Sequence, residues 1–138
     1  MPFHPYLFFG GNCREAFTRY QEVFGGELVL ITAEQMGEVP PGASPDLIMH
    51  AALKLGDELL MGSDDPTDGF QAPQGMKVNF STTDAAEATK AFEAISEGGS
   101  VDLPIGPTAW SPAFGMCVDR FGTPWMISAD PDEAFSPG

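Results

Sequence analysis

Residues 12–26 read NCREAFTRYQEVFGG, and residues 84–99 repeat their pattern as DAAEATKAFEAISEGG. In both stretches apolar residues recur at helical spacing, and a glycine pair follows, which is typical of the end of a helix. Asn12 and Asp84 belong to the residue types that cap helix N-termini, and a glutamate stands three positions after each, as in a capping box. The sequence therefore predicts two similar helices, over residues 12–24 and 84–97.

The surroundings of the two helices repeat as well. A strand-like run precedes each helix, at residues 3–9 and 76–82, and another follows each glycine pair, at residues 27–32 and 100–103. Each half then offers a hairpin, with arms at 47–55 and 58–63 in the first half and at 114–119 and 124–128 in the second. The chain is therefore an internal duplication of a β-α-β-β-β unit.

This pattern predicts an α+β fold in which two curved mixed sheets surround a cleft and one helix covers the outer face of each sheet. We expect one domain, 1–138, made of module one (1–65), module two (75–129) and a tail (130–138). The proline-rich segments 34–46 and 104–112 are expected to be loops, because proline cannot donate to a sheet ladder. Such loops either border a functional cleft or simply connect elements at the surface.

Composition excludes several classes of function. The chain has 138 residues, 43% of them hydrophobic, and a formal net charge of −14. A nucleic-acid binder needs a basic face, and anionic membranes attract basic segments, so neither partner is expected. Most carboxylates, Asp64 among them, are expected on a solvated surface because they fall in loops, turns, helix caps and the tail.

Other signals of location and chemistry are absent from the sequence. No apolar run approaches the roughly 20 residues of a membrane span, and the N-terminus lacks the basic region of a secretory signal. The two cysteines, Cys13 and Cys117, form no disulfide framework, so a cytoplasmic protein is expected. The sequence contains no nucleophile-elbow, P-loop or dinucleotide motif, and no glycine-rich methyl-donor motif follows a strand.

Several motifs resemble one protein family over nearly the whole chain. They are Gly11-Asn12-Cys13-Arg14-Glu15-Ala16, Phe24-Gly25-Gly26-Glu27, His50-Ala51, Met61-Gly62-Ser63-Asp64 and Asp119-Arg120-Phe121-Gly122-Thr123-Pro124-Trp125-Met126. The pattern resembles the vicinal oxygen chelate superfamily (glyoxalases, bleomycin resistance proteins and dioxygenases). Its closer match is the PhnB-like branch, some of whose members carry a demethylubiquinone methyltransferase-like label. The resemblance implies a homodimer with a cleft inside each curved sheet, and it implies no particular reaction.

Glyoxalase chemistry needs a divalent metal, typically held by a His or Gln on the first strand of each half and a Glu on the last strand. Aligning the helices without a gap places the first-strand positions at Pro5 and Lys77, so that His4 falls one residue out of register and on the opposite face. The last-strand positions fall near Leu60 or Met61 and near Met126, where no carboxylate is present. Thioether, alkyl and ammonium groups do not replace a carboxylate on a hard divalent ion. No cofactor is therefore expected, although a non-standard metal site stays open.

The best candidate for chemistry is His50. On its strand Leu47, Met49, Ala51, Leu53 and Leu55 suit packing under a helix, whereas Ile48, His50, Ala52 and Lys54 should face the cleft. A cleft histidine can act as an acid, a base or a hydrogen-bond donor near neutral pH. The alternative is a hydrogen-bonded structural histidine.

Five further residues mark the expected cleft. Lys77 and Asn79 share one face of their strand, and Lys77 either binds an anionic group or pairs with a neighbouring aspartate. Trp110 either stacks on a flat ligand or anchors its own loop. Met61 and Met126 suit an adaptable apolar pocket wall or a plain core.

Three hypotheses follow for function. The first is a metal-free protein that binds a small molecule in an apolar cleft. The second is an enzyme that acts on a small oxygenated substrate, with His50 as acid or base or with an unfamiliar metal site. The third is a structural or interaction protein whose cleft is filled by its own side chains.

Overall fold

The predicted duplication is confirmed by the computed structural model, which describes residues 3–66 and 69–130. The first half contains β1 (Tyr6–Phe9), α1 (Cys13–Phe24), β2 (Glu27–Thr32), α2 (Ala33–Met36), β3 (Ile48–Leu55) and β4 (Glu58–Asp64). The second contains β5 (Val78–Thr82), α3 (Ala85–Ser96), β6 (Ser100–Gly106), β7 (Ala113–Val118) and β8 (Pro124–Ala129). Each half thus has the β-α-β-β-β order, and the first adds the short helix α2.

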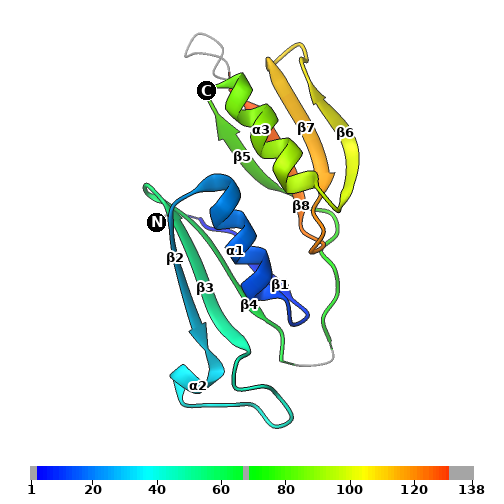
Figure 1. Ribbon diagram of the computed structural model, residues 1–138. Helices are drawn as coiled ribbons and strands as arrows, with labels where there is room; N and C mark the ends of the chain where they lie inside the picture. Colours follow the sequence, from blue (N-terminus) through cyan, green and yellow to red (C-terminus); the bar gives the residue numbers. More distant parts are fainter. Residues whose placement is uncertain (1–2, 67–68, 131–138) are drawn as a thin grey trace. The chain divides into compact units, whose positions relative to one another are not determined.

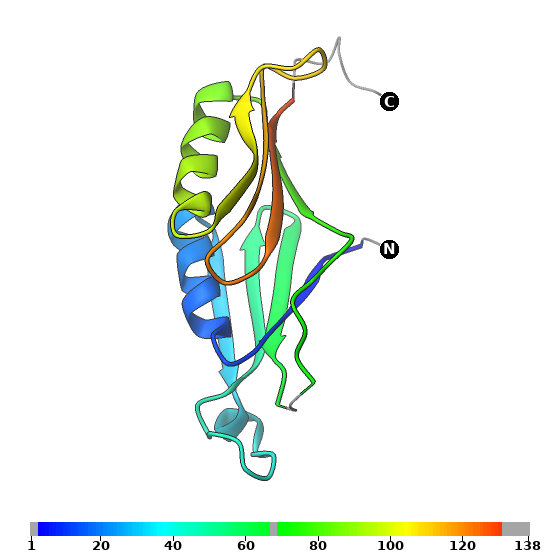
Figure 2. The same ribbon diagram turned by 90° about the vertical axis from the view of Figure 1, so that its right-hand side faces the viewer.

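Each half builds its own four-stranded mixed sheet. The strand orders are β1-β4-β3-β2 and β5-β8-β7-β6, and in each sheet the first pair is parallel and the other two pairs are antiparallel. The chain divides into two compact units with the boundary between Ala72 and Pro73. Helix α1 lies across one face of the first sheet and α3 across one face of the second (Figures 1 and 2). These features confirm the α+β fold class.

The core of each unit lies between the helix and its sheet. Helix α1 buries Cys13, Ala16, Phe17 and Tyr20, and α3 buries Ala88, Ala91, Phe92 and Ile95. All of these except Ala91 are members of the two predicted apolar stripes. The strands contribute side chains from alternate positions, such as Leu7 and Phe9 of β1 and Ala51 and Leu53 of β3. Burial of these apolar side chains is the main term that stabilises each unit.

The start of α1 is capped from a distance, which corrects the prediction for Asn12. The Asn12 side chain makes no capping hydrogen bond. Instead Asp64, at the end of β4, accepts hydrogen bonds at Oδ1 from the backbone N–H groups of Gly11 (3.1 Å) and Cys13 (2.9 Å), and at Oδ2 from that of Ile48 (3.0 Å). Asp64 is 3% exposed, so the prediction of a solvated Asp64 is wrong as well. Helix α3 follows the prediction, because Asp84 accepts from the backbone N–H groups of Ala86 and Glu87.

A second buried aspartate fixes the turn between β7 and β8. Asp119 accepts hydrogen bonds from the backbone N–H groups of Phe121 and Thr123, both at 2.9 Å, and from Nε1 of the buried Trp125 at 2.9 Å. The motif over residues 119–126 therefore specifies a turn and its anchor in the core. Asp64 has a similar role for the motifs at residues 11–16 and 61–64, because it belongs to the second motif and binds backbone N–H groups of the first.

Element boundaries differ from the prediction by more than one residue at four places. Strand β1 begins at Tyr6 rather than residue 3, and β5 begins at Val78 rather than residue 76. Strand β6 continues through Pro104 to Gly106, where a loop was expected; β6 is an edge strand, which tolerates proline. The expected loop 34–46 begins with most of α2, whose capping box is formed by Thr32 and Gln35.

Register shifts occur in both sheets, and one of them explains a further difference from the prediction. The pairing of β2 with β3 shifts between Ile31 and Thr32, so that Ile31 pairs with His50 and Thr32 with Ile48. Ile48 is consequently 1% exposed in the core instead of facing the cleft as predicted. Strand β6 has two such shifts, one on either side of Leu103, and it is visibly bent (Figure 2).

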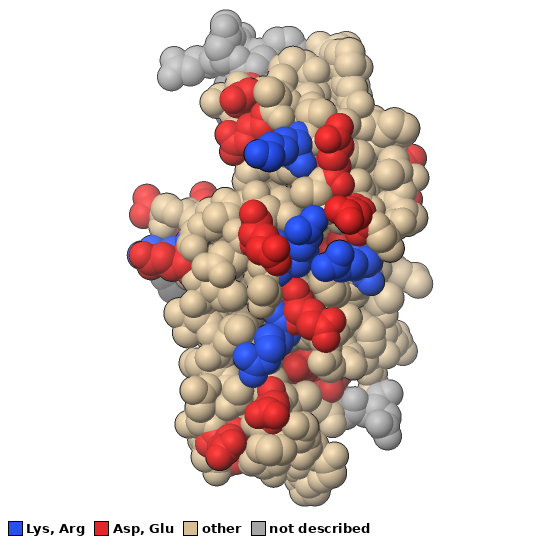
Figure 3. All heavy atoms as spheres, viewed as in Figure 1, with Lys and Arg blue, Asp and Glu red and all other residues tan. Residues whose placement is uncertain are grey.

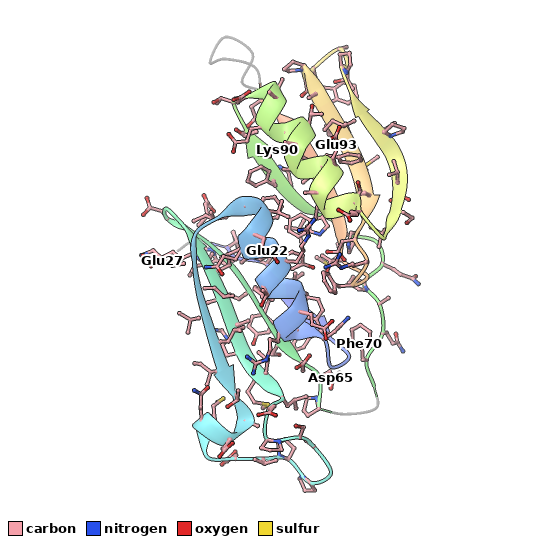
Figure 4. All side chains as sticks on the ribbon, viewed as in Figure 1. Glu22, Glu27, Asp65, Phe70, Lys90 and Glu93 are labelled. Carbon is pink, nitrogen blue, oxygen red and sulfur yellow. The ribbon has the colours of Figure 1, made fainter. Side chains whose placement is uncertain are left out.

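The segment after β4 packs onto the first unit. A Cβ atom placed on Gly10 would lie 3.0 Å from Cδ2 of Phe70, and Figure 4 shows Phe70 and Asp65 near the start of α1. The predicted tail lies outside the described residues except for Asp130. Among the described residues, no helix has the length and apolar character that crossing a membrane requires.

Candidate functional site

The face of each sheet opposite its helix is here called the open face, and it carries the predicted site residues that lie in strands: His50, Met61, Asn79 and Met126. Across the first sheet Tyr6, Met61, Ala52 and Val29 form one row of paired residues. The equivalent row of the second sheet consists of Asn79, Met126, Met116 and Leu103. Met61 and Met126 therefore occupy equivalent central positions, as predicted from their motifs.

These ladders correct the register of the first strands. Because Tyr6 pairs with Met61 and Asn79 with Met126, Tyr6 is the counterpart of Asn79, and His4 is the counterpart of Lys77. The predicted match of Pro5 with Lys77 is wrong. Three residues separate β1 from α1 but only two separate β5 from α3, so an ungapped alignment of the helices misplaces the strands by one residue. Along β1, Tyr6 and Phe8 are exposed while Leu7 and Phe9 are buried, and His4 lies two residues before the strand begins.

His50 lies on the open face of the first sheet. Its Nδ1 atom is 3.3 Å from the Tyr6 hydroxyl, and the two rings lie 5.9 Å apart. Phe8, which is 56% exposed, lies 5.2 Å from the Tyr6 ring and extends this aromatic surface. The sequence did not indicate that Tyr6 is the partner of His50, because the direction of the Tyr6 side chain depends on how β1 pairs with β4.

Lys77 and Met126 line one pocket in the second unit. The pocket has a volume of about 550 Å³, within the range of small-molecule sites. Its lining residues are Pro73, Gln74, Gly75, Met76, Lys77, Val118, Pro124 and Met126. Asn79 is exposed and pairs with Met126 in the ladder, so the second unit brings together three of the predicted residues. Met76, which had been assigned only to the start of a strand, is a pocket residue that the sequence interpretation missed.

Lys77 also forms an ion pair with an aspartate, which was one of the two alternatives predicted for it. Its Nζ atom is 3.3 Å from Oδ2 of Asp102, and the two side chains are 29% and 45% exposed. Asp102 lies in β6, between Val101 and Leu103, where the ladder shifts register and leaves Asp102 without a paired residue. Sequence alone did not indicate this partner, because the bulge that places Asp102 is a feature of the folded sheet.

Trp110 lies toward another part of the second sheet. Its ring is 56% exposed and meets the Phe114 ring edge-on at 5.5 Å. The turn that carries it is well anchored: the Thr108 hydroxyl accepts from the backbone N–H groups of Trp110 and Ser111, and buried Ser111 donates to Ala129 O. Trp110 is thus held at the surface by its turn, with much of its ring accessible.

Neither cysteine is activated. Burial raises the pKa of the Cys13 thiol to about 12, and the nearby Asp64 carboxylate adds to the shift. Burial likewise raises the pKa of Cys117 to about 11, with a contribution from Asp119. The thiolate is the reactive form, so both thiols are chemically inert near neutral pH.

The residues do not fit a glyoxalase-type metal site. Nδ1 of His4, which lies just before β1, is buried without a hydrogen-bond partner and is therefore one potential metal-binding atom. The last strands, however, place thioethers at Met61 and Met126, and thioethers are poor ligands for hard divalent ions. Within residues 3–66 and 69–130, no three or more His, Cys, Asp or Glu side chains form a group that could hold a metal ion.

Comparison with known proteins identifies the family. A family model described as 3-demethylubiquinone-9 3-methyltransferase matches residues 2–128. The chain belongs to this PhnB-like family. Protein YjdN of Escherichia coli is 30% identical to it over 93% of this chain and 95% of that protein. The crystal structure of protein PA1353 from Pseudomonas aeruginosa is 41% identical, covers 96% of this chain and 99% of its own, and superposes with a TM-score of 0.85.

More distant structures share the fold of this PhnB-like protein. A structure described as a PhnB protein from Bacillus cereus is 23% identical over 93% of this chain and 98% of its own, with a TM-score of 0.78. A glyoxalase/bleomycin resistance protein/dioxygenase family enzyme from Burkholderia phytofirmans is 15% identical over 91% of this chain and 94% of its own, with a TM-score of 0.58. The predicted PhnB-like branch is confirmed by the family model and the similar proteins, and the more distant structures show that the fold is shared.

Proposed function

We propose that this PhnB-like protein binds a small organic molecule on the open face of its second sheet, without the divalent metal of the glyoxalases. The observation that carries the proposal is the pocket of about 550 Å³, in which apolar side chains surround a single lysine. Met76 and Met126 give this pocket an adaptable wall, because unbranched thioether side chains adopt many shapes. From the family resemblance we also expect the protein to assemble as a homodimer.

Filling the pocket tests this proposal. The Met126→Trp variant places a larger side chain in the pocket, whereas Met36→Trp places the same residue on α2, where Met36 is 55% exposed. A library of small organic molecules is screened against the untagged wild-type protein by thermal shift, and dissociation constants of the hits are measured. We expect Met126→Trp to lose the hits and Met36→Trp to retain them. Hits that bind the Met126→Trp protein with unchanged affinity would contradict the proposal.

A second candidate function, acid–base catalysis on a small oxygenated substrate, is favoured by the contact between Tyr6 and His50. If the Tyr6 hydroxyl donates to Nδ1, the neutral imidazole carries its proton on Nε2 and can donate it. Replacement of His50 by Ala would then abolish turnover with little loss of stability, because His50 lies on the open face rather than in the core. Turnover that survives His50→Ala would exclude this role, and a large loss of stability would make His50 structural.

A further inference from the structure

The ion pair between Lys77 and Asp102 joins the two outer strands of the second sheet. Lys77 directly precedes β5, and Asp102 belongs to β6, while β8 and β7 lie between them. Three strand spacings of about 4.8 Å would separate these edges by about 14 Å in a flat sheet. The sheet is not flat, however: β6 has two register shifts and is bent (Figure 2), and the Nζ–Oδ2 distance is 3.3 Å. The pair therefore reaches across the sheet beside the pocket.

The pocket itself offers one charge and much apolar surface. Lys77 is the single charged residue among those that line it, while Pro73, Met76, Val118, Pro124 and Met126 are apolar. Asp102 contacts Lys77 without lining the pocket. A carboxylate of the protein thus already binds the ammonium group at the position that an anionic ligand would use.

We infer that the pocket binds small organic anions with an apolar body, and that the ligand carboxylate replaces Asp102 on Lys77. This inference rests on the proposed function, because it names the chemical class of ligand for the same pocket. The exchange costs little, since a half-exposed ion pair is weak and the released Asp102 carboxylate regains water. The ligand gains a charge-assisted hydrogen bond and burial of its apolar body. Without a ligand, Asp102 keeps the Lys77 ammonium group paired with a carboxylate of the protein itself. Such internal pairing fits a chain whose net charge is −14.

Octanoate and its neutral amide, octanamide, test the inference, because they share an apolar body and differ in charge. Binding is measured by calorimetry, and the site is checked by NMR of methyl-labelled methionines. We expect octanoate to shift the Met76 and Met126 resonances and to bind more tightly than octanamide. Lys77→Met should weaken octanoate binding about tenfold and leave octanamide unchanged. Asp102→Asn should tighten octanoate binding, by up to about fivefold, because it removes the competing carboxylate.

Lys90→Met is the matched control, because Lys90 lies on the solvent-facing side of α3 in the same unit (Figure 4). It removes the same charge from the unit and should leave octanoate binding unchanged. If octanamide binds the pocket as tightly as octanoate, or if Lys77→Met weakens neither ligand, the anion inference is overturned while the proposed function stands. If neither molecule shifts Met76 or Met126, the anion inference is overturned, and the proposed function is decided separately by whether the hits of the screen bind the Met126→Trp protein.

Discussion

At the scale of single residues, the motifs that identify the family act mainly on the fold. Asp64 and Asp119 use their carboxylates to bind backbone N–H groups, and Asp119 also anchors the Trp125 indole. Sequence reasoning detected these motifs but assigned Asp64 to the solvated surface, because a carboxylate that accepts three backbone hydrogen bonds is recognised only after the chain has folded. Asp64 and Asp119 therefore act through the fold, whereas Pro124 and Met126 of the motif over residues 119–126 also line the pocket.

We predict that Asp64→Ala lowers the free energy of unfolding by about 3 kcal/mol, because it leaves three backbone N–H groups without their acceptor. Urea denaturation followed by circular dichroism measures this change. Glu38→Ala, at an exposed position of the same unit, is the control and should change stability by less than about 0.5 kcal/mol. Equal effects of the two substitutions would contradict the structural role of Asp64.

The raised pKa of Cys13 predicts how stability depends on pH. In the unfolded chain this thiol loses its proton near its ordinary pKa of 9.0, whereas in the folded protein the pKa is about 12. Above pH 9 the unfolded state binds fewer protons than the folded state, so the free energy of unfolding falls as pH rises. Cys13→Ala should flatten this fall between pH 9 and 11 in denaturation curves. An unchanged slope would show that Cys13 is accessible to water.

At the scale of elements, the sequence predicts both long helices and the strands of both hairpins, because their periodicity is local. Its errors arise where an element depends on its neighbours. Pro104 is tolerated because β6 is an edge strand, and Ile48 enters the core because the ladder between β2 and β3 shifts register. The same reason explains why the Tyr6–His50 contact and the Lys77–Asp102 pair could not be predicted, since both join strands that are distant in sequence.

The packing of α3 on its sheet gives a test at this scale. A Cβ atom at Gly115 of β7 would lie 2.8 Å from Cε2 of Phe92 on α3 and 2.9 Å from Cα of Ile105. We predict that Gly115→Ala lowers the free energy of unfolding by about 1–3 kcal/mol through overpacking. Gly106→Ala in β6 is the control, because no atom lies within 4 Å of the added Cβ. Two variants of equal stability would contradict the close approach of α3 to β7.

At the scale of the whole molecule, the net charge of −14 does not concentrate on the proposed site. Lys and Arg side chains over α3 lie beside Asp and Glu side chains in Figure 3, as Lys90 and Glu93 do in Figure 4. Among the described residues, the acidic group next to the pocket is Asp102, which is paired with Lys77. The prediction that carboxylates in loops and turns lie on the solvated surface holds for Glu38, which is exposed, and is wrong for Asp64, which is buried.

The side chains at the glyoxalase metal-ligand positions predict that the purified protein contains little metal. We expect protein purified without a histidine tag to contain nickel, zinc, manganese and iron far below one equivalent, because thioethers occupy the central positions Met61 and Met126. Elemental analysis by mass spectrometry, before and after dialysis against a chelator, measures this content. A stoichiometric metal that survives dialysis would refute the metal-free proposal and direct attention to His4.

The central claim is that the pocket of the second unit is a small-molecule site, and methionine-methyl NMR of the unmodified chain tests it most directly. The seven methionines report on both units at once. We predict that molecules found in the thermal-shift screen shift the Met76 and Met126 resonances in a saturable way and leave that of exposed Met36 unchanged. Saturable binding that leaves Met76 and Met126 unshifted would contradict the claim.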